Sequence, residues 1–245
     1  MATKIRLLAL DMDGTTLNED KEISSENRQW IQRALDAGVM VMFATGRPLQ
    51  EVLSYKEELG LQTPMVLLNG SEVWSQTGEC IERHFLNHDD LIELHHLAVK
   101  YGTWFWGYTM DGQVNKNTFK DEFLANEWMK FGIHSHDRGI IQEIRELIKG
   151  WNRLEVTSSN LNNIEINPKG VTKASGVKVI GKLFGIDMDQ VMAIGDSLND
   201  APLVAEAGLG IAMGNAEDAL KQIADGITES NEKDGVAKAI EKYLF

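Results

Sequence analysis

The sequence predicts an α/β protein whose core is a doubly wound, Rossmann-like parallel sheet interrupted by an inserted α+β unit. Both ends of the 245-residue chain contain apolar runs that do not alternate and that are separated by amphipathic helices. This pattern is typical of parallel strands that helices cover on both faces. The middle of the chain instead alternates between polar and apolar residues, as antiparallel strands with one solvated face do.

The first seventy residues predict three strands and two helices. The strands are expected in the apolar runs at 5–10, 39–48 and 65–70. Ser24 or Ser25 can cap the helix between the first two strands, and Gly38 closes it. Pro48 is placed to open the next helix, which ends near Gly60. Strands that alternate with helices in this way are expected to be parallel neighbours.

The middle of the chain predicts a smaller antiparallel unit. Residues 102–117 alternate like a hairpin, and residues 153–170 form a second alternating pair joined by a polar turn. Amphipathic helices are expected at 91–101 and 140–147. Helices beside an antiparallel sheet make an α+β unit, and this one has the size of a small domain.

The last third of the chain returns to the first pattern. Thr172 can cap a helix over 173–184. Further strands are expected at 191–200, 208–216 and 226–230, and further helices at 200–207, 216–224 and 235–244. The predicted catalytic core is therefore residues 1–84 and 168–245, and the inserted unit is residues 85–167.

Composition excludes several classes of partner. The chain has 24 basic and 37 acidic residues, a net charge of −13 that is spread along its length. Such a surface repels nucleic acid and anionic lipid, so neither is an expected partner. The apolar run after Lys4 and Arg6 stops too early for a signal peptide, and no run approaches the roughly 20 residues of a membrane span. With Cys80 as the single cysteine, we expect a cytoplasmic protein without an internal disulfide.

Polar residues follow the core strands or begin core helices at several places. They are Asp11 and Asp13, Thr45-Gly46-Arg47, Lys173, and the acids Asp196 and Asp200 with Asn199 between them. Ligands of open parallel sheets bind at the edge where the strands end. Three or more carboxylates at one edge are costly unless a cation lies among them, and Mg²⁺ prefers such oxygen ligands.

The remaining polar groups suit a phosphate. Thr45 supplies a hydroxyl, and Gly46 an unobstructed amide. Lys173 adds a positive charge near a helix N-terminus, where anions are stabilised. The sequence therefore predicts a phosphoryl-transfer site with Mg²⁺ as cofactor, in which one carboxylate acts as a nucleophile.

The segments DMDGTTL, ATGRP, GVTK and GDSLNDAPL, in this order, resemble the four motifs of the haloacid dehalogenase superfamily. Within it the chain is similar to the Cof-type phosphatases, whose α+β cap domain is inserted after the third core strand. The resemblance covers nearly the whole chain, including LNG at 68–70. It implies a Mg²⁺-dependent phosphatase of small phosphorylated metabolites, such as sugar phosphates, that works through a phosphoaspartyl intermediate.

The resemblance implies a role for each matching residue. Asp11 matches the nucleophile, and Asp13 matches the general acid/base, whose backbone carbonyl also binds Mg²⁺. Asp196 matches the other carboxylate that binds the metal. Asp200 matches an acid that does not bind the metal itself but orients Asp196. The residues that match phosphate-binding positions are Met12 and Gly46 through their amides, Thr45, Lys173 and Asn199. Lys169 is an alternative to Lys173 as the phosphate-binding lysine. Arg47, Asn115 and Lys116 are candidate substrate contacts.

The inserted unit departs from the subgroup's pattern. No strand is evident before the helix at 140–147, where the sequence reads HSHDRG, so we expect a cap sheet of reduced size. Trp104, Trp106 and Tyr108 share one face of the predicted hairpin. We expect them to pack against helices rather than line a substrate pocket.

Two rival functions are a sugar phosphomutase, which also has paired aspartates, and a non-enzymatic phosphate-responsive binding module. A mutase that holds a sugar bisphosphate calls for several cap arginines, and the candidates are Arg138, Arg145 and Arg153. A receiver-type module is about half as long as this chain and lacks the second aspartate. The particular substrate and the oligomeric state are left open.

Overall fold

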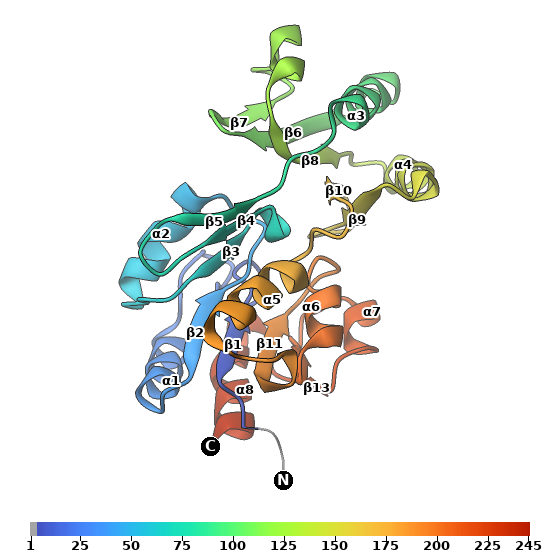
Figure 1. The fold of residues 1–245 in the computed structure, drawn as a ribbon. Coiled ribbons are helices and arrows are strands. Elements are labelled where there is room, and N and C mark those ends of the chain that lie inside the picture. The colour runs from blue at the N-terminus through green and yellow to red at the C-terminus, as the bar shows by residue number, and fades with distance from the viewer. Residues whose placement is uncertain (1–3) are drawn as a thin grey trace.

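One parallel sheet contains the apolar runs from both ends of the chain, in the strand order β13-β12-β11-β1-β2 (Figure 1). The computed structural model describes residues 4–245. The strands of this core sheet are β1 (Leu7–Leu10), β2 (Met40–Phe43), β11 (Val191–Gly195), β12 (Leu209–Ala212) and β13 (Gly226–Ile227). Every residue of β1 and β11 is buried, which explains why these strands read as continuous apolar runs.

Helices cover both faces of the core sheet, because alternate residues of its strands point to opposite sides. Leu8 and Leu10 pack in one apolar cluster with α1 and α8, whereas Leu7 and Ala9 pack in a second cluster with α5. The helices of the core are α1 (Ser25–Asp36), α2 (Leu49–Glu58), α5 (Lys173–Phe184), α6 (Ala201–Glu206), α7 (Asp218–Lys221) and α8 (Gly235–Leu244). The predicted doubly wound α/β fold is confirmed.

Two predicted helix starts are confirmed by their capping contacts. The Ser24 hydroxyl accepts a hydrogen bond from the N–H of Asn27 at the start of α1. At the start of α5, Thr172 and Ser175 form a capping box. Lys173 is therefore the first residue of α5.

The third predicted strand is shorter than expected, and it opens an antiparallel sheet that the sequence pattern did not indicate. The strands of this sheet are β3 (Met65–Leu67), β4 (Glu72–Trp74) and β5 (Cys80–Arg83). A parallel bridge between Ala44 and Val66 joins β3 to the edge of the core sheet. The prediction of a strand through residue 70 is wrong, because Leu68 and Asn69 have φ angles of 49° and 59°. Residues 68–70 form a 3-10 turn instead.

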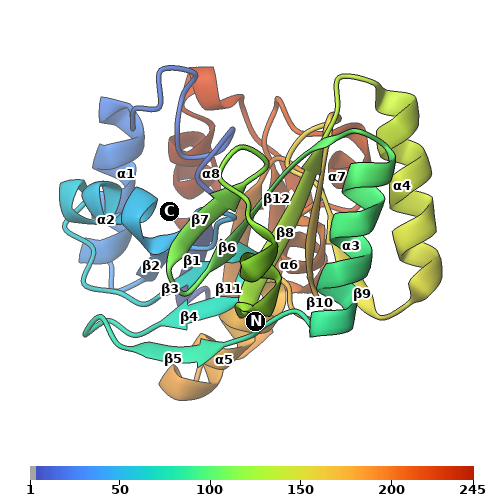
Figure 2. The same ribbon diagram turned by 90° about the horizontal axis from the view of Figure 1, so that it is seen from above.

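A second five-stranded sheet, antiparallel and in the order β7-β6-β8-β10-β9, lies above the core in Figure 1. We call the segment His88–Pro168 that contains it the cap. Its strands are β6 (Trp104–Thr109), β7 (Gly112–Asn115), β8 (Trp128–His134), β9 (Leu154–Thr157) and β10 (Asn163–Pro168). The helices α3 (His88–Lys100) and α4 (Arg138–Trp151) pack on one face of this sheet, side by side in Figure 2.

The expected reduction of the cap sheet is wrong, because β8 lies before α4. This strand is central in the sheet and pairs with both β6 and β10. All of its residues except His134 are buried. A strand buried on both faces lacks the alternation that marks a half-exposed strand, and Lys130 and Gly132 interrupt its apolar run. The HSHDRG segment instead ends β8 and supplies Asp137 as the cap of α4.

The two faces of the cap sheet have different surroundings. Phe105 and Ile166 point to the helices and belong to the apolar core of the cap. Trp106 and Tyr108 point to the opposite face and line a cavity between the cap and the core. The expectation that Trp104, Trp106 and Tyr108 pack against helices is therefore wrong, since the third aromatic residue, Trp104, is exposed. Alternation puts Phe105 on the helix-covered face, and a single strand pattern does not reveal which face the helices cover.

Short connections complete the fold. Residues 4–245 contain three further 3-10 turns, Asp121–Ala125, Met188–Gln190 and Asn231–Lys233. Across residues 4–245, no helix is both long enough and apolar enough to cross a membrane.

Candidate active site

Asp11, directly after β1, is buried and bound by a lysine from a distant part of the chain. Lys173 Nζ donates hydrogen bonds to Asp11 Oδ1 and Asp200 Oδ1, each at 2.7 Å. The second oxygen of Asp200 accepts from the backbone N–H groups of Asp196 and Ser197 at 3.1 and 3.2 Å. Burial disfavours the charge of Lys173, but the two carboxylates outweigh burial and raise its pKa. A buried ammonium group thus faces the predicted nucleophile.

The carboxylates of Asp11, Asp196 and Asp200 form a cluster in which one oxygen of each lies within 4.8 Å of the others. Burial, followed by repulsion from Asp11 and Asp200, raises the pKa of Asp196 to about 9. Burial also raises the pKa of Asp11 to about 7, against the attraction of Lys173. A cation bound among these oxygens favours their ionised forms. Carboxylate oxygens are the ligands that Mg²⁺ prefers.

Gly14 leaves room for the carboxylate of Asp196. Its φ is 73°, and a Cβ on it would lie 2.4 Å from Asp196 Oδ2. The other oxygen of Asp196 accepts a hydrogen bond from the Thr15 hydroxyl at 3.4 Å. The residues present therefore fit a divalent cation held by Asp11 and Asp196, with Asp200 holding the Asp196 loop in place.

Asp13 points away from this cluster and pairs with two cations. Arg47 Nε donates to Asp13 Oδ2 at 2.7 Å, and Arg47 Nη2 donates to Asp13 Oδ1 at 2.8 Å. Lys21 Nζ lies 2.8 Å from the same Oδ1. Burial opposes the charge of Asp13, but the hydrogen bonds and charges of Arg47 and Lys21 outweigh it and lower its pKa to about 2. In this arrangement Asp13 is an ionised carboxylate, and Arg47 is paired with it.

The predicted phosphate-binding residues Thr45, Gly46 and Asn199 line the same cavity as Asp11, which has a volume of about 440 Å³, whereas Lys173 is buried behind Asp11. Thr45 follows β2, and its hydroxyl accepts from the N–H of Arg47 at 3.2 Å. Asn199 donates to Asn69 Oδ1 at 3.3 Å, which joins it to the turn after β3. Thr45, Gly46, Arg47 and Asn199 all line the cavity.

Other predicted residues lie elsewhere. The Met12 side chain is fully buried in the core, which leaves only its backbone for a ligand. Lys169 is exposed, whereas its rival Lys173 contacts Asp11. Lys116 donates to backbone carbonyls of its own cap unit, and neither Lys116 nor Asn115 is among the lining residues described for the cavity.

The cap contributes lining residues that the sequence analysis did not assign to the site. Lys130, Ser159, Asn160 and Glu165 were not considered, and Trp106 and Tyr108 were expected to pack against helices instead. The sequence contains one signal for Lys130. A lysine within the apolar segment WMKFGIH is unusual unless an acidic side chain pairs with it. Its partner, Glu165, comes from a different strand, so the pairing itself depends on the sheet register.

Comparison with known proteins is consistent with this geometry. A family model of haloacid dehalogenase-like hydrolases matches residues 8–138 and 113–240. The chain is 42% identical over 241 residues to 5-amino-6-(5-phospho-D-ribitylamino)uracil phosphatase YcsE of Bacillus subtilis, covering 98% of this chain and 96% of that protein. It is 30% identical to a phosphoglycolate phosphatase of Methanobrevibacter smithii, covering 98% and 99% of the two chains.

Solved structures of the same fold cover nearly the whole chain. A haloacid dehalogenase-like hydrolase from Bacteroides thetaiotaomicron aligns with a TM-score of 0.81 and 29% identity over 98% of this chain and 99% of that chain. The subclass IIB sugar phosphatase BT4131 aligns with a TM-score of 0.84 at 21% identity, covering 97% of this chain and 98% of that chain. The chain therefore belongs to the haloacid dehalogenase-like hydrolases, in the group of Cof-type phosphatases with an inserted α+β cap.

Proposed function

We propose that the protein is a Mg²⁺-dependent phosphatase that hydrolyses small phosphorylated metabolites through a phosphoaspartyl intermediate on Asp11. The observation that carries this proposal is the buried contact of Asp11 with Lys173 beside the carboxylate of Asp196. A carboxylate that attacks phosphorus needs a nearby positive charge, because the phosphate is itself an anion. The second aspartate, Asp13, stands two residues further on at the wall of the same cavity.

The first step forms the intermediate. A carboxylate oxygen of Asp11 attacks phosphorus, and the bond between phosphorus and the alcohol oxygen breaks. Lys173 stabilises the charge that gathers between Asp11 and the phosphate. Asp13 gives a proton to the departing alcohol oxygen. Because Asp13 is ionised while it pairs with Arg47 and Lys21, those pairs must open before Asp13 is protonated.

The second step returns the enzyme to its starting state. Asp13, now ionised, accepts a proton from a water molecule as that water attacks phosphorus. The bond between phosphorus and Asp11 breaks, and inorganic phosphate leaves. When bound by Asp11, Asp196 and the Asp13 carbonyl, Mg²⁺ supplies charge neutralisation between the carboxylates and the phosphate oxygens.

Two observations support hydrolysis over the mutase alternative. The cap arginines Arg138, Arg145 and Arg153 contact Asn162, the Asn163 carbonyl and the acids Asp90 and Glu93, respectively. Among the residues described for the cavity wall there is no cap arginine for a second phosphate. The chain's relatives of 42% and 30% identity also carry phosphatase names, which makes a ribitylaminouracil phosphate and phosphoglycolate the first substrates to examine.

A phosphate-release assay over a panel of phosphorylated metabolites, with Mg²⁺ and with chelator, tests the proposal. We expect release only with Mg²⁺, and a loss of about a thousandfold or more in Asp11→Asn, because the amide is not a nucleophile. Asp36→Asn, an exposed aspartate on α1, is the matched control and keeps full activity.

Two results would contradict the proposal. Transfer of phosphate within a bisphosphate sugar without release of free phosphate would support the mutase. Equal activity of the Asp11→Asn variant and the wild type would exclude Asp11 as the nucleophile.

A further inference from the structure

The cap face above the aspartates contains a buried ion pair that the proposed mechanism does not use. Lys130 of β8 and Glu165 of β10 lie with Nζ and Oε2 2.6 Å apart, and their side chains are 3% and 7% exposed. Both residues line the cavity that contains Asp11. Burying two charges is costly even when they pair, and apolar residues often stabilise such positions better. A buried ion pair at the wall of this cavity is therefore a candidate for contact with a bound molecule.

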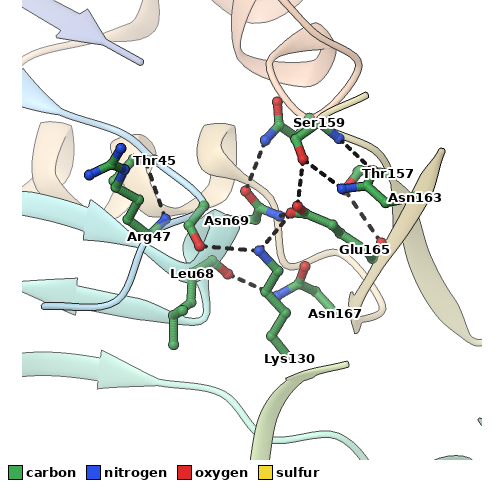
Figure 3. Close-up of polar contacts among 12 residues, drawn as sticks. Thr45, Arg47, Leu68, Asn69, Lys130, Thr157, Ser159, Asn163, Glu165 and Asn167 are labelled. Carbon is green, nitrogen blue, oxygen red and sulfur yellow. Dashed lines mark hydrogen bonds and ion pairs between the residues drawn. The ribbon is translucent and has the colours of Figure 1, made fainter. Parts of the chain in front are cut away.

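Core and cap residues together hold this pair in place (Figure 3). Asn69 of the core donates to Glu165 Oε2 at 2.6 Å, and Ser159 of the cap donates to Glu165 Oε1 at 2.8 Å. Lys130 Nζ donates to the carbonyl oxygen of Gly46, in the predicted phosphate loop, at 3.1 Å. A Cβ on Gly46 would lie 3.2 Å from Lys130 Nζ, so the glycine permits this close approach.

The lysine has one hydrogen-bond donor left. An ammonium group has three N–H bonds. Within residues 4–245, Lys130 Nζ has two acceptors, Glu165 Oε2 and the Gly46 carbonyl. Because Lys130 lines the cavity, its third N–H is available to an oxygen atom of a bound molecule.

The surroundings of the pair favour a neutral hydroxyl group over a second anion. Glu165 balances the charge of Lys130, so the pair offers a bound group no net positive charge. Trp106 and Tyr108 provide an aromatic wall beside the pair. A carbon chain with hydroxyl groups matches such a wall, because C–H groups contact the rings while hydroxyl oxygens reach the ammonium.

We propose that Lys130 determines substrate specificity by donating a hydrogen bond to a hydroxyl oxygen of the leaving alcohol, while Glu165 positions the ammonium group. This inference rests on the proposed phosphatase function, since the alcohol is the part of a phosphate monoester that lies beyond the phosphate. It assigns the recognition of hydroxylated leaving groups to one cap residue.

Two substrates with the same carbon chain test the inference, ribitol phosphate and n-pentyl phosphate, which differ only in hydroxyl groups. For the wild type we expect kcat/KM to be at least about tenfold higher for ribitol phosphate, because a site built to bind a hydroxyl group rejects the analogue without it. In Lys130→Met/Glu165→Gln this preference falls to about one, mainly through a higher KM for ribitol phosphate. Activity toward pentyl phosphate changes less than about threefold.

The variants are chosen to separate binding from folding. The double variant avoids the uncompensated buried charge that Lys130→Met alone would leave on Glu165. Glu165→Gln alone keeps the ammonium but removes its counter-charge and loosens its position, so we expect lower stability and an intermediate substrate preference. Lys149→Met, an exposed lysine on α4, is the matched cap control with an unchanged preference.

The outcomes distinguish the inference from the proposed function. If the double variant loses activity equally on both substrates, Lys130 only supports the Gly46 loop and the inference is wrong. If the wild type has no preference for ribitol phosphate, the inference is also wrong while the phosphatase function stands. If the wild type releases phosphate from no member of the metabolite panel, the proposed function itself fails.

Discussion

At the scale of single residues, Lys173 joins the two halves of the catalytic core. It begins α5, on the far side of the cap in sequence, yet its ammonium group binds Asp11 after β1 and Asp200 before α6. Its side chain has no exposed surface. A lysine so buried remains charged only because two carboxylates surround it, which ties the stability of the fold to the chemistry of the site.

Lys173→Met is expected to lower both stability and activity. The change leaves two buried carboxylates without their cation, and breaking a buried ion pair in this way costs about 3–5 kcal/mol at neutral pH. Urea unfolding at pH 7 measures the loss of stability, and phosphate release measures the loss of activity. Lys169→Met removes an exposed lysine four positions earlier and is expected to change neither. Equal effects of the two substitutions would contradict the assignment of Lys173.

At the scale of elements, the turn at 68–70 in the core is joined to the cap by hydrogen bonds. Asn69 in this turn accepts a hydrogen bond from Asn199 and donates one to Glu165. Nearby, Asn167 of β10 donates to the carbonyl of Leu68 at 2.9 Å. The turn holds Asn69 at a φ of 59°, a left-handed conformation that asparagine tolerates better than most residues.

The backbone and side-chain contributions of Asn69 are separable by two substitutions. Asn69→Ala and Asn69→Gly both remove the two hydrogen bonds, but only alanine is strained at positive φ. We therefore expect the alanine variant to be less stable than the glycine variant by about 1 kcal/mol. Urea unfolding of the two variants measures this difference. Equal stability would mean that the turn relaxes to a negative φ when the hydrogen bonds are lost.

At the scale of the whole molecule, several carboxylates are buried beside the cavity between the cap and the core. The resulting pKa increases of Asp11, to about 7, and of Asp196, to about 9, link stability to pH. A carboxyl group whose pKa is raised on folding stabilises the fold at low pH, and this contribution is lost as the pH rises through the raised pKa. The relevant window runs from the ordinary value of 3.8 up to about 9.

Removal of Mg²⁺ is therefore expected to lower the stability of the fold most at high pH. With chelator, the melting temperature should fall as the pH is raised from about 5 to about 9. In this range Asp11 and Asp196 are forced to ionise without a cation beside them. Mg²⁺ at about 100 times its Kd should restore about 2.7 kcal/mol of stability. Thermal melts across this range, with Mg²⁺ and with chelator, measure both effects. Asp196→Asn should lose the response to Mg²⁺, and a response that persists in this variant would contradict the metal site.

The order and type of most elements were predictable because local patterns mark them. Continuous apolar runs marked β1 and β11, and capping residues such as Thr172 marked helix starts. The strand β8 was missed because burial on both faces removes the alternation of a half-exposed strand. The turn at 68–70 was missed because its positive φ angles depend on contacts with distant residues, among them Asn199 and Asn167.

The sequence by itself determined the α/β core, the inserted cap and the candidate residues of the carboxyl edge, since Asp11, Thr45 and Asp196 each follow an apolar strand whose place is set locally. Only the tertiary structure decided which charged side chains form ion pairs. The pairing of Asp13 with Arg47 and of Lys130 with Glu165 joins residues 34 and 35 positions apart, on different elements. Such contacts depend on sheet register and cap closure, and neither is encoded in a short segment of sequence.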